Sequence, residues 1–306
     1  MKSSQPKRIK TISEFHKFRN LPLPEHPLIS VIDYASIKNS SENNSISWVL
    51  DFYAISLKKS PYAKFSYGHQ SCDFDGGSLF FMAPNQVFRV EVNQNYTPMN
   101  SGWLLLIHPD FIWDTTLAKT IKQHDFFDYS VNEALFLSPK EESTINHIVQ
   151  NVQQEYQTNL DSFSKQIIST HIENLLSYSE RFYNRQFITR EKTNHQILER
   201  LEVLLIDYFN SDDLVLKGLP SVQYVSQALN VSQSYLGSLL RVLTGQNTQQ
   251  HIHEKLIEKA KEKLSTTNLT VSEIAYELGF EHSQSFSKLF KSKTQLSPIK
   301  FRQLFH

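Results

Sequence analysis

Three polar residues near the C-terminus, Gln284, Lys288 and Lys291, are spaced at i, i+4 and i+7 and would lie on one face of a helix. Glutamine can pair with base edges and lysine attracts phosphates, so these residue types suit nucleic-acid binding. The apolar residues between them would form a buried stripe on the opposite face: Phe286, Leu289 and Phe290. The spacing therefore predicts a helix with one face in a core and one face available to a duplex.

A second helix is expected just before this one. Thr270 and Glu273 have the spacing of a capping box, in which each side chain accepts a hydrogen bond from the other residue's backbone N–H. Gly279 can adopt the left-handed conformation that ends a helix. The apolar residues between these signals share one face: Val271, Ile274, Ala275 and Leu278. Two helices joined by so short a turn form a helix-turn-helix, whose second helix enters the DNA major groove.

The same pattern occurs twice. Residues 222–231 align with residues 271–280 at an offset of 49, and Asn230, which tolerates the left-handed conformation, takes the place of Gly279. After the turn the offset becomes 50. The aligned pairs there are Leu236 and Phe286, Leu239 and Leu289, Leu240 and Phe290, Arg241 and Lys291, and Thr244 and Thr294. One such pattern would suit an ordinary surface pair of helices, whereas a repeat favours two helix-turn-helix motifs.

A third helix is predicted between the two copies, over residues 248–264. Its apolar residues recur on one face: Ile252, Leu256, Ala260 and Leu264. A helix of about 17 residues is about 25 Å long. A rod of that length could hold two helices near successive major grooves, which lie about 34 Å apart.

The chain has a net charge of zero, but the charge is unevenly distributed. Residues 219–306 contain ten Lys and Arg against six Asp and Glu, a net charge of +4, so residues 1–218 carry −4. A basic C-terminal part is compatible with binding to nucleic acid.

The N-terminal half has a different pattern. Short β-branched and aromatic runs between residues 29 and 112, separated by Asn-, Asp- and Gly-rich turns, predict a β-sandwich or small barrel. From Pro139, two amphipathic helices follow, with apolar stripes such as Ile145–Val149–Val152 and Ile167–Ile168–Ile172. They would either cover the β domain or pair with another subunit. The polar stretch 184–194 is the expected linker to a helix that begins near His195.

The sequence gives little support for a metal site or for acid–base catalysis. His69, His108 and His124 are isolated in sequence, so no metal site is expected. His251 and His253 fall inside a predicted helix, where residues i and i+2 point to different sides. The last candidates, Asp73 and Asp75, lie in a Gly-rich segment whose turn explains them better than catalysis does. We therefore expect neither an enzyme nor a cofactor.

Compartment signals point to the cytoplasm. The single cysteine, Cys72, rules out an intramolecular disulfide and fits a reducing compartment. No apolar segment follows the basic N-terminus, and no apolar run reaches the roughly 18 to 20 residues that span a bilayer.

The segments SQSYLGSLLRVLTGQNTQQHI and IAYELGFEHSQSFSKLFKSKTQLSPIKFR resemble the first and second helix-turn-helix of AraC/XylS-type bacterial transcription regulators. This resemblance covers about the last hundred residues. It assigns DNA contacts to two sets of residues: Gln233, Ser234, Gly237, Ser238 and Arg241 in the first copy, and Ser283, Gln284, Ser285, Ser287, Lys288 and Lys291 in the second.

Three departures from the family pattern have structural consequences. Gln295 stands where the family usually has glycine, which predicts a strained turn. His282 occupies a helix-capping position that often holds Asp or Ser, so Ser283 is expected to cap instead. Gly237 and Ser238 have small side chains, so the first copy is expected to read few bases and to contribute mainly backbone contacts.

The resemblance also implies a plan for the whole chain, an α+β multidomain protein. It comprises a cupin-like sensor barrel or sandwich over residues 1–138, dimerisation helices and a linker over 139–190, and an all-α domain with two helix-turn-helix motifs over 191–306. The segment GGSLFFMAPNQVFRVEV resembles a strand-turn-strand unit of such barrels. Candidate effector contacts are Tyr53, Arg89 and His108.

The function implied by the resemblance is sequence-specific regulation of transcription, as an activator because that role is commoner in the family. The expected partners are double-stranded DNA, a small-molecule effector, RNA polymerase and a second copy of the chain, with no membrane. Two alternatives stay open: a cupin-type metalloenzyme with a helical adjunct, and a constitutive dimeric regulator whose barrel binds nothing.

Overall fold

A computed structural model describes residues 6–37, 47–59, 66–67, 70–71, 77–89, 101–130, 133–158, 160–189 and 191–304. The chain forms two compact units, Met1–Gln186 and Phe187–His306. The division falls within the stretch predicted as a linker, but this stretch is helical: α5 (Ser164–Thr189) ends in it and α6 (Glu191–Asn210) begins in it, before His195. Gln186 and Phe187 are both buried, at 1% exposure each. Packing of these two side chains against the rest of the protein stabilises the helix in this otherwise polar segment.

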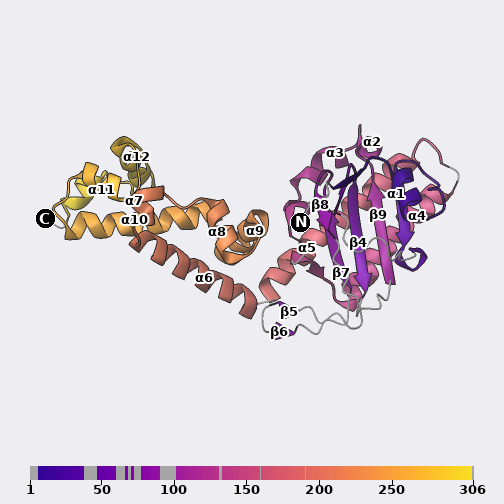
Figure 1. Ribbon diagram of the computed structural model, residues 1–306, viewed down its shortest axis with the longest axis horizontal. Helices are drawn as coiled ribbons and strands as arrows, with labels where there is room; N and C mark the ends of the chain where they lie inside the picture. Colours follow the sequence, from indigo (N-terminus) through magenta and orange to yellow (C-terminus); the bar gives the residue numbers. More distant parts are fainter. Residues whose placement is uncertain are drawn as a thin grey trace. The chain divides into compact units, whose positions relative to one another are not determined.

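The first unit contains a five-stranded antiparallel sheet in the order β10-β7-β4-β9-β2, of which Figure 1 labels β7, β4 and β9. The strands are β2 (Ile29–Asp33), β4 (Tyr53–Lys59), β7 (Ser78–Met82), β9 (Ser101–Ile107) and β10 (Leu135–Phe136). In the central strand, Ile55 lies opposite Leu105 of β9 and Phe81 of β7. Apolar and β-branched residues fill these positions because both faces of the sheet are covered.

A second sheet in this unit has three strands, in the order β1-β3-β8. Its strands are β1 (Lys7–Ile9), β3 (Ser47–Leu50) and β8 (Val87–Arg89); α1 (Ile12–Phe18) follows β1, and β5 (Ser66–Tyr67) pairs with β6 (Gln70–Ser71). The apolar run 47–59 is divided at Asp51 and Phe52, so that β3 and β4 belong to different sheets. Arg8 holds this corner through an ion pair of 2.8 Å with Asp51.

The two sheets share one core. Its buried members come from α1 and from strands of both sheets: Ile9, Ile12, Phe15, Ile32, Ile37, Trp48, Leu50, Phe52, Ala54, Leu104 and Leu106. The first unit is therefore built as two layers of strands around an apolar interior, as the alternation of short strands and turns predicted.

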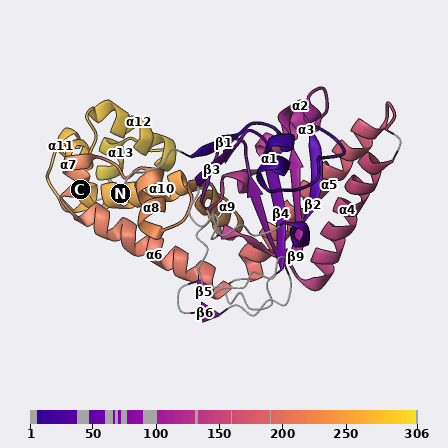
Figure 2. The ribbon, with the colours of Figure 1, turned by 45° about the vertical axis from the view of Figure 1, so that its right-hand side comes forward.

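Helices cover the opposite face of the five-stranded sheet. The views in Figures 1 and 2 show α4 (Pro139–Gln157) beside β9, and α4 also contacts β2. Val31 N–H donates to the Tyr156 hydroxyl at 2.9 Å, and Trp103 Nε1 donates to Asn146 Oδ1 at 2.8 Å. Of the two roles expected for these helices, covering the sheet is the one that their buried residues show: Ile145, Ile148, Val149, Val152, Ile168, Ile172, Leu175 and Leu176.

One member of the predicted stripe is not buried. Ile167 is 40% exposed, and two further apolar residues near the start of α5, Leu160 and Phe163, are 50% and 68% exposed. The remaining elements of the unit are α2 (Pro109–Ile112), α3 (Leu117–Thr120) and three single-turn 3-10 helices: η1 (Tyr34–Ser36), η3 (Ile121–Gln123) and η4 (Asp125–Asp128).

The second unit is helical throughout its described part. After the end of α5 and α6 come α7 (Asp213–Lys217), α8 (Val222–Leu229), α9 (Gln233–Thr244), α10 (Thr248–Thr266), α11 (Val271–Glu277), α12 (Ser283–Thr294) and α13 (Pro298–Arg302). Within the ranges that the structure describes, no helix combines the length and apolarity needed to cross a membrane.

Candidate nucleic-acid interface

The first helix-turn-helix is formed by α8 and α9. Ser221 and Ser232 cap the two helices by accepting hydrogen bonds from Tyr224 N–H and Tyr235 N–H, each at 3.1 Å. Asn230 ends α8 with φ of 58°, the left-handed conformation expected from its alignment with Gly279. The turn between the helices is thus set by one residue in an unusual conformation and one capping serine.

The second helix-turn-helix is formed by α11 and α12. The predicted capping box is present: Glu273 N–H donates to Thr270 Oγ1 at 3.2 Å, and Thr270 N–H donates to Glu273 Oε2 at 2.6 Å. Gly279 has φ of +78°, and a Cβ there would lie 2.6 Å from the Leu214 carbonyl oxygen. Only glycine fits this turn, because both the conformation and the space exclude a side chain.

The start of α12 differs from the prediction. His282 is the N-cap residue and makes no side-chain cap hydrogen bond, while Ser283 is already the first residue of the helix. Ser283 therefore does not cap α12, because its backbone is helical and its side chain is one position too late. We call α9 the first reading helix and α12 the second reading helix. A serine caps the start of the first, whereas no side chain caps the start of the second.

The two reading helices have the same length and align without a gap. Each has 12 residues, and the offset of 50 relates both their first and their last residues. Five outward positions of α9 correspond to five of α12: Gln233 to Ser283, Ser234 to Gln284, Gly237 to Ser287, Ser238 to Lys288 and Arg241 to Lys291. These positions recur at helical spacing and make one face of each helix.

Burial separates the two faces of each reading helix. In α12, Phe286 and Phe290 are fully buried, whereas Gln284, Ser285, Lys288 and Lys291 are exposed and Ser283 and Ser287 are partly exposed. In α9, Tyr235, Leu236, Leu239 and Leu240 are buried, whereas Gln233 and Arg241 are exposed and Ser234, Gly237 and Ser238 are partly exposed. All the residues that the family resemblance assigned to DNA contacts thus have solvent access.

Aromatic packing fixes α12 on the unit. The Phe286 ring lies 5.6 Å from that of Phe280 and 5.8 Å from that of Phe290, whose ring is 5.5 Å from that of Phe301. In the first copy, Tyr235 packs edge-on against Phe187 at 5.2 Å. The equivalent position in α12 is Ser285, which is exposed, so the two copies are seated by different side chains.

Helix α10 connects the two copies. Its apolar face is buried as predicted, with Ile252, Leu256, Ala260 and Leu264 all at 0% exposure. Its 19 residues give a length of about 28 Å. Figure 1 shows α8 and α9 toward one end of α10, and α11 and α12 toward the other. The connection is a packed rod that contacts α6, α9, α11 and α13.

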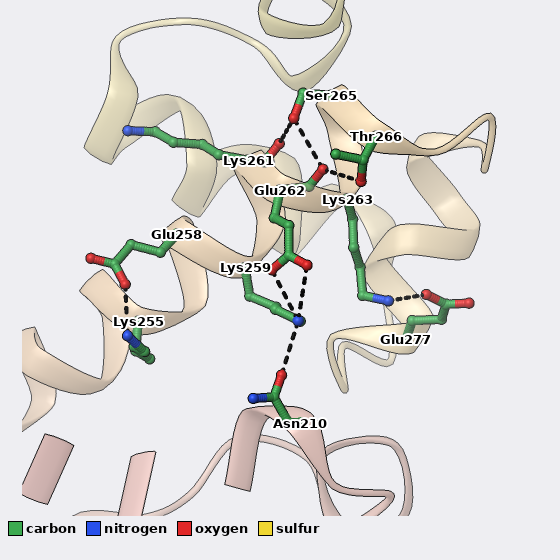
Figure 3. Close-up of polar contacts among 10 residues, drawn as sticks. All are labelled: Asn210, Lys255, Glu258, Lys259, Lys261, Glu262, Lys263, Ser265, Thr266 and Glu277. Atoms are coloured by element: carbon green, nitrogen blue, oxygen red, sulfur yellow. Dashed lines mark hydrogen bonds and ion pairs between the residues drawn. The ribbon is translucent and has the colours of Figure 1, made fainter. Parts of the chain in front are cut away.

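The lysines of α10 are mostly neutralised by neighbouring acids (Figure 3). Lys255 pairs with Glu258 at 2.9 Å, Lys259 pairs with Glu262 at 2.9 Å, and Lys263 pairs with Glu277 at 2.6 Å. Lys259 also donates to Asn210 Oδ1 at 2.9 Å. In Figure 3 the Lys261 side chain extends away from these paired groups. The positive charge of the rod is therefore largely compensated within the unit.

The cations of α12 are different. Lys288, Lys291 and Lys293 are exposed, and within the described ranges none has a carboxylate within ion-pair distance. Lys293 was not among the residues assigned to DNA contacts; the only sequence signal for it was the excess of basic residues in this part of the chain. Lys288 and Lys291 lie on the outward face with Gln284 and provide an attractive surface for phosphates, whereas Lys293, nine positions after Gln284, lies on the opposite side of the helix, near His253 of α10.

The three candidate effector residues lie in different local surroundings. Tyr53 is buried at 7% exposure and packs edge-on against Phe127, with 5.2 Å between ring centroids. His108 caps α2, where its Nδ1 accepts from Asp110 N–H at 3.3 Å. Arg89 ends β8, and its side chain lies outside the described part of the structure. Tyr53 and His108 therefore make structural contacts, and their assignment to an effector site stays a prediction.

The described residues provide no group of three His, Cys, Asp or Glu side chains that could hold a metal ion. His124 contacts Glu180 at 3.2 Å and stacks on Phe126, while His251 and His253 contact Thr244 and Gln249, respectively. Four earlier candidates, His69, Cys72, Asp73 and Asp75, lie outside the described residues. Nothing in the described ranges favours the metalloenzyme alternative.

Comparison with known proteins agrees with this geometry. Residues 225–304 match a protein family described as "Helix-turn-helix domain". The chain is 37% identical over 75 residues to the raffinose operon transcriptional regulatory protein RafR of Pediococcus pentosaceus, covering 24% of this chain and 27% of that protein. It is 33% identical over 82 residues to the Msm operon regulatory protein of Streptococcus mutans, covering 27% of this chain and 30% of that protein.

Two further similarities concern the same region. The transcriptional activator AarP of Providencia stuartii is 32% identical over 82 residues, which cover 27% of this chain and 61% of that protein. The solved C-terminal domain of the response regulator yesN from Fusobacterium nucleatum is 28% identical, with a TM-score of 0.30, covering 34% of this chain and 95% of that one. The chain spans half or less of the length of RafR, the Msm regulator and an uncharacterised regulator of Pseudoalteromonas carrageenovora. The C-terminal part of this chain is a helix-turn-helix domain of the AraC type.

Proposed function

We propose that this protein is a sequence-specific DNA-binding regulator of transcription whose two reading helices enter successive major grooves. The observation that carries the proposal is the match between the outward faces of α9 and α12, which are polar and solvent accessible while their inward faces are buried. A pair of helices that only packed against other helices would not need the same polar face twice.

The two reading helices are proposed to make different kinds of contact with DNA. In α12, Gln284 and Lys288 have side chains long enough to form hydrogen bonds with base edges, and Lys291 would contact a phosphate. In α9 the outward residues are smaller, with Ser234, Gly237 and Ser238 between Gln233 and Arg241. This helix would come close to the duplex and contribute backbone and phosphate contacts more than base reading.

The first unit is proposed to be a cupin-like sensor of a small-molecule effector, since it has two layers of strands around a common interior. We further propose that the protein is an activator that contacts RNA polymerase in the cytoplasm. A dimer would form through the apolar residues left exposed near the start of α5, namely Leu160, Phe163 and Ile167. The apolar stripe of α4 is not available for this, because it covers the sheet.

The regulator proposal is tested by selecting bound DNA from a random pool with the purified chain. A recurring sequence with two half-sites about one helical turn apart is expected. On that DNA, Lys288→Ala and Gln284→Ala should each weaken binding by about 1–3 kcal/mol, whereas the exposed Lys261→Ala on α10 should leave affinity unchanged. Recovery of no common sequence, or equal affinity for all three variants and the parent, would overturn the assignment.

A further inference from the structure

Two cations of the first unit, Arg19 and Lys58, lie near the interior between its two sheets. Lys58 is in β4, on the same face as Ala54, which belongs to the shared core. Arg19 ends α1, where its backbone N–H donates to the Phe15 carbonyl at 3.0 Å. Strand and helix thus bring two positive charges to one region of the unit.

Aromatic side chains surround both cations. The Lys58 ammonium is 5.8 Å from the ring centroid of Tyr34 and 5.4 Å from that of Phe80. The Arg19 guanidinium is 5.0 Å from the ring centroid of Trp48. Tyr34 is also hydrogen bonded to Ser56, the residue two positions before Lys58 on the same face of β4. These rings stabilise the cations in part, since a cation over an aromatic face is attracted by the negative charge of the ring face.

No carboxylate of the described residues pairs with either cation. Two other basic residues of this unit are paired: Arg8 with Asp51, and Lys59 with the buried Glu142. In contrast, Arg19 Nε is buried and has no hydrogen-bond acceptor. A buried donor on a charged group without an acceptor is unfavourable, so the Arg19 guanidinium, which has no acceptor for its Nε among the described residues, is suited to binding an anionic group.

Electrostatics agree with this geometry. Burial lowers the pKa of Arg19 and that of Lys58, and the charge of Arg19 lowers the pKa of Lys58 further. Burial also raises the pKa of Tyr34 to about 12, so its hydroxyl stays protonated and can donate a hydrogen bond. Lys58 nevertheless keeps solvent access, which means that a molecule from solution can reach it.

We propose that these residues, the Arg19–Lys58 cluster (Arg19, Tyr34, Trp48, Ser56, Lys58 and Phe80), bind a small organic carboxylate with an aromatic or apolar body. The two cations would hold the carboxylate, with the Tyr34 and Ser56 hydroxyls beside it, while the rings of Trp48 and Phe80 would contact the body of the ligand. This inference rests on the proposed function in that it names the chemical class of the effector.

The test is titration calorimetry on the full chain with phenylacetate, with its neutral isostere phenylacetamide and with inorganic phosphate. Phenylacetate is expected to bind saturably, and both comparison compounds at least about tenfold more weakly, because one lacks the charge and the other lacks the ring. Lys58→Met should weaken phenylacetate binding by at least about tenfold, and Arg19→Lys should also weaken it. Lys17→Met, which removes an exposed cation from the same helix α1, should leave binding unchanged.

Several results would overturn the site. These are no saturable phenylacetate binding, equal affinity for phenylacetamide or phosphate, or unchanged affinity in a folded Lys58→Met protein. Binding of the selected DNA is measured in parallel on the same preparations. DNA binding without phenylacetate binding rejects only the carboxylate site, whereas phenylacetate binding by a protein that selects no DNA sequence supports the site and rejects the regulator.

Discussion

Gly245 and Gln295 occupy equivalent positions in the two helix-turn-helix copies, and both have a left-handed backbone, with φ of 76° and 63°. Each is the C-cap residue of its reading helix, and each donates its N–H to the carbonyl of the residue four positions earlier, Arg241 or Lys291. Glycine adopts this conformation freely, whereas a residue with a Cβ is destabilised there by roughly 1–2 kcal/mol. At this turn the second copy therefore carries backbone strain that the first does not.

The first prediction follows from this difference. Gln295→Gly should raise the free energy of unfolding by about 1 kcal/mol, because it removes the strain and loses only the exposed hydrogen bond of 3.3 Å from Gln295 Nε2 to Ser292. Gly245→Gln, the reverse change in the first copy, should lower it by a similar amount. Urea unfolding followed by circular dichroism measures both. If the two changes altered the free energy of unfolding in the same direction, Gln295 would not be the strained residue of the pair.

The second prediction concerns Gly237, which lies inside α9. Glycine in a helix interior is about 1 kcal/mol less favourable than alanine, and a Cβ at Gly237 would meet no other atom of the unit within 4 Å. Gly237→Ala should therefore stabilise the protein by about 0.5–1 kcal/mol. If α9 lies close against DNA, the same methyl group should weaken binding to the selected site, so that stability and affinity change in opposite directions.

The matched control is Gly279→Ala. There the added Cβ would lie 2.6 Å from the Leu214 carbonyl oxygen in a left-handed turn, so the variant should lose more than about 1–2 kcal/mol of stability. A Gly237→Ala protein that is more stable and binds the site as tightly as the parent would show that α9 does not approach DNA at this residue.

Much of the second unit could be predicted from sequence because its signals are local. The capping box at Thr270, the left-handed Asn230 and the buried stripe of α10 all depend on residues a few positions apart. The turn at Gly279 was also predicted, but not the reason that only glycine fits, since Leu214 approaches it from another helix. The prediction that Ser283 caps α12 was wrong, because the sequence does not fix a helix boundary to within one residue.

The first unit was less predictable because its structure depends on contacts between distant residues. The break at Asp51 and Phe52 is set by the pairing of β3 with β1 and of β4 with β9, which no local pattern shows. The Arg19–Lys58 cluster joins residues from α1, β3, β4, β7 and η1, so isolated sequence signals could not find it. Candidate pocket residues chosen from sequence alone, Tyr53 and His108, proved to be a core residue and a helix cap.

The third prediction concerns pH. Burial lowers the pKa of His251 and of His253, and the charge of Lys293 lowers that of His253 further. A group whose pKa is lower in the folded state stabilises the fold fully above its unfolded value, about 6.5, and this contribution is lost as pH falls through the folded pKa. The thermal midpoint of the protein should therefore fall between pH 7 and pH 5.

His251→Gln and His253→Gln should make this fall smaller, because glutamine keeps a polar side chain but does not titrate. His282→Gln is the matched control, since His282 is exposed and makes no cap hydrogen bond. Identical pH profiles for the parent and for both α10 variants would rule out these two histidines as the cause of acid destabilisation.

The fourth prediction concerns the salt dependence of DNA binding. The logarithm of affinity falls with the logarithm of salt concentration, and each phosphate contact contributes about 0.9 to the slope. Lys291→Ala removes an exposed cation on the outward face of α12 that pairs with no carboxylate of the described residues, so it should reduce the slope by about 1. Lys255→Ala is the matched control on α10, where the ammonium already pairs with Glu258.

Since that pair forms within the protein, Lys255 should release no DNA-bound counterion, and its removal should leave the slope unchanged. Binding of the selected DNA is measured at a series of salt concentrations by fluorescence anisotropy. The decisive comparison is between helices: a reduced slope in Lys255→Ala together with an unchanged slope in Lys291→Ala would mean that α10, and not the outward face of α12, faces the phosphates. That result would overturn the proposed orientation of the second reading helix.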